Sequence, residues 1–108
     1  MPDPDPDDVD LTLVVMAFTA ADPERLLSVL AKYVVLARGQ PGCRNIDLIA
    51  SVTHPGRLVV IQKWGSPEAQ RAHFDSPAMV EMAEGCRGLL SEPPDIDLLE
   101  AISAHDLA

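Results

Sequence analysis

Arg57-Leu-Val-Val-Ile-Gln-Lys-Trp64 is the most strand-like segment of the chain, because β-branched and apolar residues fill it and turn residues precede it. The turn is His54-Pro55-Gly56, and before it residues 43–52 alternate between apolar and polar side chains. The two segments are therefore predicted to form a β-hairpin. Alternation along the second strand places four side chains on one face of the sheet: Leu58, Val60, Gln62 and Trp64.

The rest of the chain supplies two more strands and the helices. Asp22-Pro23 opens a helix that Gly39 ends, because a carboxylate caps free N–H groups and proline suits the first helical position. Ser66-Pro67 and Ser76-Pro77 each start a further helical segment. Strands are predicted at residues 11–18 and 95–102. The order β-α-β-β-α-β predicts an α+β, ferredoxin-like fold, with helices on one face of a four-stranded antiparallel sheet.

One domain is expected over residues 11–102. Residues 1–10 alternate Asp and Pro and are predicted to be a disordered acidic tail, because proline lacks the N–H donor and the carboxylates repel one another. Residues 103–108 are expected to form a C-terminal tail.

Residues 11–18 and residues 58–61, within two of the predicted strands, are apolar on both faces. An antiparallel sheet with helices on one side normally shows water the other side, and its strands then alternate. The second face therefore needs another cover, and an identical sheet is the simplest one. We expect a homodimer in which two sheets meet as a dimeric α/β barrel.

Composition excludes several classes of partner. The net charge is −9, and five Asp residues within the first ten contribute more than half of it. An acidic chain without a basic stripe repels phosphates, so neither nucleic acid nor a membrane is expected as a partner. No apolar run approaches the roughly 20 residues of a membrane span, and the N-terminus lacks the pattern of a signal peptide. Two cysteines without Cys-x-x-Cys spacing are expected to be reduced thiols in a cytoplasmic protein.

Several short motifs together resemble the antibiotic biosynthesis monooxygenase family, and its small quinol monooxygenases above all. They are Gly42-Cys43, Val60-Ile-Gln-Lys-Trp64, Ser66, Ala72-His73 and Ser76-Pro77. The resemblance implies the ferredoxin-like fold, a homodimer through the sheets and a pocket between sheet and helices. It also implies oxidation of a small aromatic phenol or quinol by O2 without metal or flavin, although one branch of the family binds and degrades haem.

The resemblance makes His73, Trp64 and Gln62 the candidate catalytic residues, and two interpretations of each aromatic group stay open. Trp64 either stacks on a flat substrate and orients an oxygen atom, or fills the core beneath a helix. His73 either accepts a phenolic proton, or is a buried histidine that holds a helix on the sheet. Gln62 would donate a hydrogen bond from the same strand face. The expected pocket-lining residues are Val15, Leu58, Val60, Met79 and Met82.

The chain also departs from the family pattern. Ala83 stands where the haem-degrading branch has its axial histidine, and Val15 and Met16 stand where that branch has an asparagine. His54, His73 and His105 lack metal-site spacing, so no cofactor and no metal are expected.

Two functions remain open. One is a cofactor-independent monooxygenase, and the other is a ligand-binding or stress-response protein that keeps the barrel without the chemistry.

Overall fold

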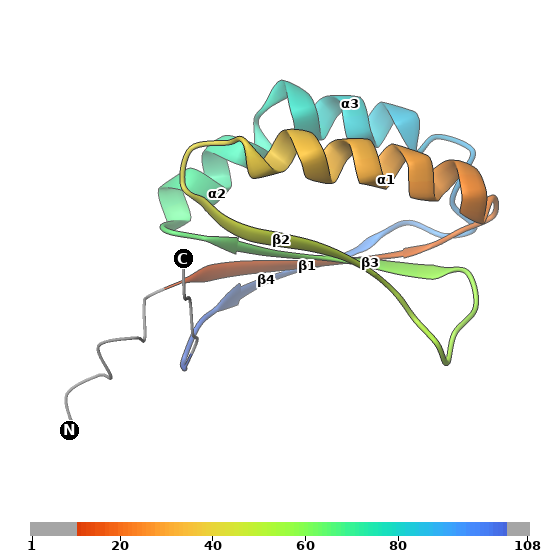
Figure 1. The fold of residues 1–108 in the computed structure, drawn as a ribbon, viewed down its shortest axis with the longest axis horizontal. Coiled ribbons are helices and arrows are strands. Elements are labelled where there is room, and N and C mark those ends of the chain that lie inside the picture. The colour runs from red at the N-terminus through yellow and green to blue at the C-terminus, as the bar shows by residue number, and fades with distance from the viewer. Residues whose placement is uncertain (1–10, 104–108) are drawn as a thin grey trace.

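The computed structural model describes residues 11–103, which form an antiparallel sheet and three helices (Figure 1). The strands lie in the order β2-β3-β1-β4, and each pairs antiparallel with its neighbours. This is the predicted ferredoxin-like arrangement. The predicted tails, residues 1–10 and all but the first residue of 103–108, lie outside the described residues. The elements are β1 (Thr12–Thr19), α1 (Pro23–Arg38), β2 (Cys43–Ala50), β3 (Arg57–Trp64), α2 (Pro67–Phe74), α3 (Pro77–Gly85) and β4 (Asp95–Glu100).

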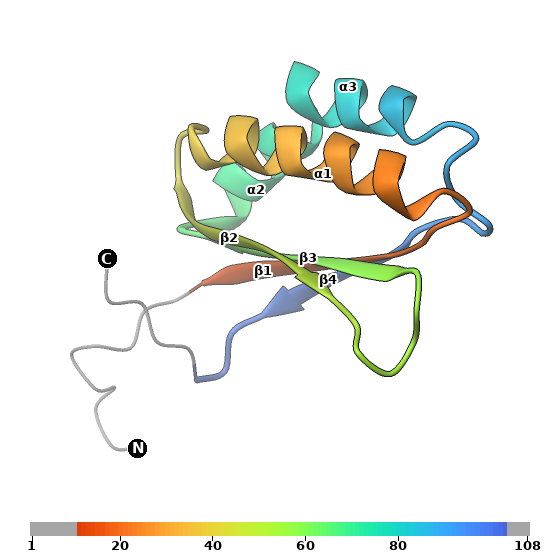
Figure 2. The same ribbon diagram turned by 45° about the vertical axis from the view of Figure 1, so that its right-hand side comes forward.

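All three helices lie on one face of the sheet (Figures 1 and 2). Every second side chain of β1 and β3 is buried beneath them, while the side chains between are only half-buried. The alternation predicted for residues 57–64 is therefore confirmed. The buried strand residues on the helix side include Val14, Met16, Phe18, Leu58, Val60, Gln62 and Trp64.

The other face of the sheet has no helix over it and carries a band of apolar side chains. Val15 pairs with Ile61, and Ala17 pairs with Val59, in the register of β1 and β3. Val15 was expected in the pocket wall. It lies instead on this open face, because its side chain alternates with those of Val14 and Met16.

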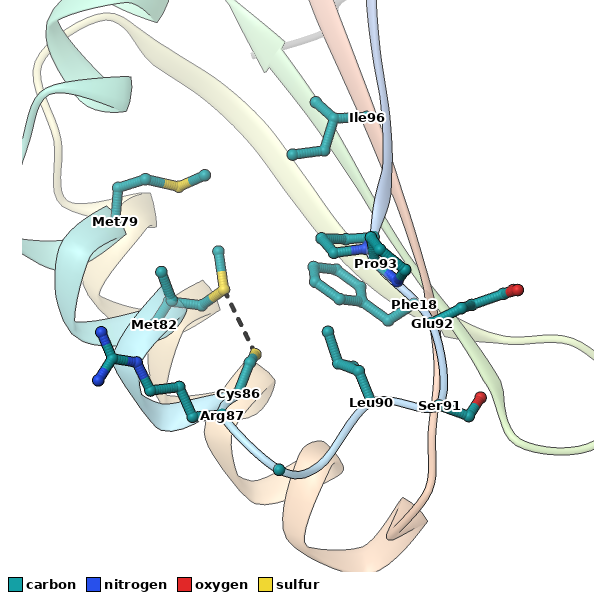
Figure 3. A pocket seen from close by; sticks show the side chains of 13 residues that line it. Phe18, Met79, Met82, Cys86, Arg87, Leu90, Ser91, Glu92, Pro93 and Ile96 are labelled. Atoms are coloured by element: carbon teal, nitrogen blue, oxygen red, sulfur yellow. Dashed lines mark hydrogen bonds between the residues drawn. The ribbon is translucent and has the colours of Figure 1, made fainter.

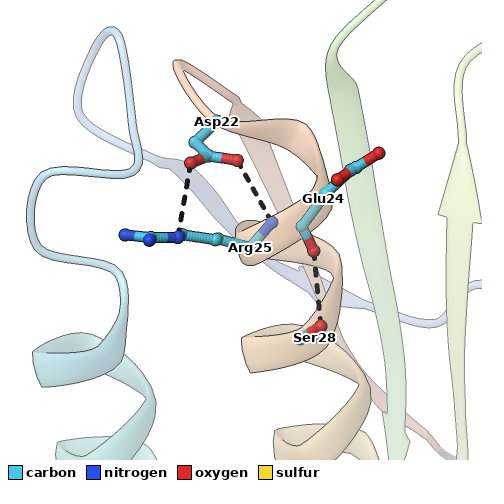
Figure 4. Close-up of polar contacts among 4 residues, drawn as sticks. All are labelled: Asp22, Glu24, Arg25 and Ser28. Atoms are coloured by element: carbon cyan, nitrogen blue, oxygen red, sulfur yellow. Dashed lines mark hydrogen bonds and ion pairs between the residues drawn. The ribbon is translucent and has the colours of Figure 1, made fainter.

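Each helix begins at a capping residue followed by proline. At the start of α1, an Asp22 carboxylate oxygen accepts a hydrogen bond from the Arg25 backbone N–H at 3.3 Å (Figure 4). The other carboxylate oxygen lies 3.7 Å from the Arg25 guanidinium. Ser66 and Ser76 cap α2 and α3 in the same way. A cap of this kind stabilises a helix by about 1 kcal/mol, so the two serines fix where each short helix begins.

Gly42 brings the start of β2 against α2. Its φ is +81°, and a Cβ built on it would stand 2.4 Å from the Cβ of Ala69. The backbone here also accepts a hydrogen bond from the Gly65 N–H at 2.8 Å. Only glycine fits this position, for reasons of both conformation and space.

The edge strand β4 is not covered by the helices. Its register with β1 points Ile96 and Leu98 to the helix side, yet they are 41% and 60% exposed. The loop that leads from α3 to β4 is held to the end of β1, since the backbone N–H of Ser91 donates to the carbonyl of Thr19 at 2.9 Å. The space between α3 and β4 is therefore bordered by this tethered loop and stays open along β4. Within residues 11–103 no helix has the length and apolar character of a membrane span.

Candidate functional site

Four buried side chains from three elements form one connected polar network. Trp64 and Gln62 come from the end of β3, His73 from α2 and Tyr33 from α1, and none is more than 2% exposed. The Trp64 indole lies against the His73 imidazole, with ring centroids 4.6 Å apart and an interplanar angle of 27°. The three predicted candidates thus do meet, and Tyr33 joins them.

The hydrogen bonds of the network run in one direction. The Trp64 indole N–H can only donate, and it donates to Gln62 Oε1 at 2.9 Å. The Gln62 amide nitrogen then donates to the Tyr33 hydroxyl oxygen at 2.6 Å. The Tyr33 hydroxyl lies 2.6 Å from His73 Nε2, and its own hydrogen is the one left to make that bond. His73 Nε2 is therefore the acceptor.

The other ring nitrogen of His73 carries the proton of the neutral imidazole. Nδ1 faces the Ser76 hydroxyl at 3.5 Å, a long contact at the cap of α3. With Nε2 accepting from Tyr33, accounting for donors and acceptors assigns the Nδ1–H tautomer to His73. The network thus links β3, α1 and α2 and ends at the start of α3.

Burial keeps both titratable groups of the network uncharged. It raises the pKa of the Tyr33 phenol to about 12, an effect that the Gln62 hydrogen bond partly offsets. Burial also lowers the pKa of the His73 imidazole below its ordinary value. A neutral phenol and a neutral imidazole are the forms that this hydrogen-bond order requires.

The side chains of the network supply one another with hydrogen-bond partners. Among the described residues, no buried side-chain nitrogen or oxygen lacks a hydrogen-bond partner. The polar side-chain atoms of Trp64, Gln62 and His73 contact one another, Tyr33 or Ser76. This arrangement is expected of side chains that hold α2 on the sheet.

A separate, apolar cavity of about 500 Å³ lies between α3 and the β4 edge (Figure 3). Met79, Met82 and Cys86 line it from α3, and Phe18 and Ile96 face them from the sheet. The Cys86 thiol donates a hydrogen bond to the Met82 sulfur at 3.7 Å, and burial raises the pKa of this thiol. Polar groups enter this wall mainly near the loop that leads to β4. They belong to Arg87, Ser91 and Glu92.

A smaller cavity of about 140 Å³ lies between α1 and α3. Tyr33 and Met82 line it, and the ion pair of Lys32 with Glu81, 2.5 Å apart, stands beside them. Met82 also lines the larger cavity, so it is a side chain that the two spaces share.

The predicted pocket residues divide between these places. Met79 and Met82 line the apolar cavity. Leu58 and Val60 share the helix-side face of β3 with Gln62 and Trp64, but they are core residues and line neither cavity. Val15 lies on the opposite face of the sheet.

The sequence interpretation did not identify Tyr33, Phe18 or Cys86 as site residues. Tyr33 follows Leu26 by seven positions and Leu30 by three, which is the spacing of the buried stripe of α1. That spacing could have indicated an inward side chain, but not the partner it would meet.

Side chains that could ligate a metal ion are scattered rather than clustered in the part of the chain that the structure describes. Across residues 11–103, no three His, Cys, Asp or Glu side chains are gathered as a metal-binding set. Ala83 lines the apolar cavity, so an axial imidazole is missing at that position of α3. His105 lies outside the described residues.

The sequence model of the antibiotic biosynthesis monooxygenase family matches residues 12–85. The comparison with curated proteins gives no match. Solved structures share the fold. Rv0793 from Mycobacterium tuberculosis is 25% identical with a TM-score of 0.77, over 85% of this chain and 95% of its own. SnoaB from Streptomyces nogalater, a cofactor-independent oxygenase, is 24% identical with a TM-score of 0.77, over 86% and 94%. PA3566 from Pseudomonas aeruginosa is 24% identical with a TM-score of 0.75, over 89% and 97%.

Proposed function

Because the chain belongs to the antibiotic biosynthesis monooxygenase family, we propose that it is a cofactor-independent monooxygenase for a small, flat phenol or quinol. The observation that carries the proposal is the apolar cavity of about 500 Å³ under α3. Its volume falls within the usual range for small-molecule sites, about 300–1,000 Å³. Thioether and aromatic side chains suit a flat aromatic ligand, because sulfur and ring edges contact its faces favourably.

The proposed reaction requires few groups from the protein. A deprotonated phenol is electron-rich enough to react with O2 directly. For an anthrone, one oxygen atom becomes the carbonyl oxygen at the methylene carbon, and the other leaves as water with the two methylene hydrogens. The protein needs only a dry cavity, a proton acceptor and a fixed orientation. The fold shared with the cofactor-independent oxygenase SnoaB supports this reading.

We assign to His73 the role of final acceptor of the proton that the substrate releases, and a supporting role to Gln62 and Trp64. The polar atoms of Gln62 and Trp64 are engaged within the network. They therefore orient the groups around His73 rather than the substrate itself.

The proposal includes a homodimer formed by the open faces of two sheets. Val15, Ile61, Ala17 and Val59 give this face a continuous apolar centre, and Ile49 on β2 extends it. Such a band on the surface of a monomer would be exposed to water, whereas a second sheet would bury it at about 25 cal/mol per Å².

Oxygen consumption tests the activity. A dihydroxynaphthalene or an anthrone should consume O2 above the buffer rate, with a chelator present and no flavin added. Ala83→Phe, which fills the apolar cavity from α3, should lower the rate by about tenfold or more because the substrate loses its place. Val80→Phe is the matched control, since Val80 is 55% exposed on the same helix and does not line the cavity.

The second candidate is a binding protein without turnover. It is favoured by the self-satisfied network, in which the polar atoms of His73, Gln62 and Trp64 all face one another or their neighbours. Under this reading, quenching of Trp64 fluorescence reports ligand binding while O2 consumption stays at the buffer rate across the phenol panel. That pair of results would replace the monooxygenase proposal.

A further inference from the structure

Tyr33 is the member of the buried network that meets a cavity. It lines the space of about 140 Å³ between α1 and α3, whereas Gln62, Trp64 and His73 line neither that space nor the larger apolar cavity. Of the four network residues, Tyr33 is therefore the one that a ligand in the space between α1 and α3 would contact.

His73 has no free lone pair with which to take a proton from a ligand. Its Nε2 accepts the Tyr33 hydroxyl at 2.6 Å, and Nδ1 carries the proton of the neutral ring. The Tyr33 oxygen is different. It donates once to His73 and accepts once from Gln62 at 2.6 Å, which leaves one of its two lone pairs unused.

We infer that Tyr33 is a catalytic residue of the proposed reaction, the group that receives the phenolic proton of the substrate and passes its own proton to His73. The substrate O–H bond breaks and its proton joins the Tyr33 oxygen, while the former Tyr33 proton moves to His73 Nε2. The products are a substrate anion, a neutral Tyr33 and an imidazolium at His73. No electron moves in this step, which rests on the proposed monooxygenase function.

Met82 determines how the substrate reaches Tyr33. It lines both cavities, and its unbranched thioether side chain has three rotatable bonds and adapts to its surroundings. A substrate held in the apolar cavity is separated from the smaller space by this flexible side chain. Rotation of Met82 would connect the two spaces and so give a substrate in the apolar cavity access to Tyr33.

The burial of His73 also restricts which phenols can transfer a proton to it. The final acceptor is a buried imidazole, and no opposite charge within the network compensates the imidazolium. An ordinary phenol has a pKa near 10, like a tyrosine, and holds its proton more tightly than a histidine with a pKa near 6.5 or lower. Phenols made acidic by a neighbouring carbonyl group are therefore the expected substrates, and the rate should rise as the phenol pKa falls.

Two measurements on the full chain test the role of Tyr33. The first is ¹⁵N NMR of the His73 ring, which should show an unprotonated Nε2 and a protonated Nδ1 at pH 7. In Tyr33→Phe this fixed tautomer should give way to a mixture, and the His73 pKa should move up, because the donor that stabilises the neutral ring is gone. The second is O2 consumption with acidic phenols, for which Tyr33→Phe should lower kcat by about 10²-fold and leave KM within a few-fold.

A protonated Nε2 in the wild type overturns the order of the network and with it the role of Tyr33. A folded Tyr33→Phe variant that keeps the wild-type kcat and pH profile overturns the proton transfer, even if the tautomer is as expected. If the wild-type protein consumes O2 no faster than buffer alone, both the proposed function and the proton-transfer step are wrong. The NMR result still decides which of Tyr33 and His73 donates the hydrogen bond between them.

Discussion

Replacing Gln62 with leucine should destabilise the protein through one buried donor that loses its acceptor. Gln62 Oε1 accepts the Trp64 indole N–H at 2.9 Å, and Trp64 is completely buried. Leucine is close to glutamine in size, so the substitution changes the hydrogen bonding more than the packing. Tyr33 loses the bond from Gln62 but keeps the bond to His73.

The structure gives the size of the effect. A buried donor without a partner costs about 1–3 kcal/mol, and the lost bond to Tyr33 costs about 0.5–1.5 kcal/mol. The apolar surface that leucine adds offsets about 1 kcal/mol. We expect Gln62→Leu to lower the free energy of unfolding by about 2 kcal/mol, which is about 8–16 °C in Tm for a domain of this size. Gln70→Leu is the matched control, because Gln70 is also buried but does not take part in the network.

The assay is urea denaturation followed by far-UV circular dichroism, since Trp64 is the sole tryptophan and cannot serve as the probe in its own variant. Trp64→Phe and the double variant complete a double-mutant cycle. Each single change leaves one partner of the bond unsatisfied, whereas the double change leaves neither. The double variant should therefore be about 1–2 kcal/mol more stable than the sum of the single losses predicts. Additive losses, within about 0.5 kcal/mol, would refute the coupling between these residues.

Three further predictions concern pH, a turn and the open face. Because burial lowers the His73 pKa, its contribution to the free energy of unfolding should be fully present above pH 6.5 and should be lost as the pH falls through the folded-state pKa. Because the Tyr33 pKa is raised to about 12, the free energy of unfolding should also fall as the pH rises from about 10 through 12. Urea titrations across pH should show this plateau, and His73→Gln should flatten its acid side below about pH 6.5. Gly42→Ala should lower the free energy of unfolding by about 2 kcal/mol or more, because alanine would meet both a left-handed φ and a steric collision. Gly88→Ala is the control: its φ is +77° but the space around it is open, so thermal melting of this variant measures the conformational cost alone. Val59→Asp should dissociate the proposed dimer in light scattering, because an unpaired carboxylate is costly to bury; a wild-type monomer at micromolar concentration would contradict the dimer itself.

Much of the fold could be predicted because its signals are local. The alternation at residues 57–64 fixes which β3 side chains face the helices, and each proline after Asp22, Ser66 and Ser76 marks where a helix begins. Such patterns depend on neighbours two to four positions apart, which the sequence displays directly. Strand ends differed by one or two residues, as at β4, which stops at Glu100 rather than at residue 102.

Only part of the candidate site could be predicted from the sequence. The chain itself determined that Gln62 and Trp64 share a strand face and that His73 lies on an inward helical face. Only the tertiary structure decided that Tyr33, 40 positions before His73, donates to it, and that Val15 turns away from the helices. The direction of the hydrogen bonds from Trp64 to His73 depends on which donors and acceptors meet across three elements. No periodicity along the chain encodes such a meeting, because the packing of α1 and α2 on the sheet creates it.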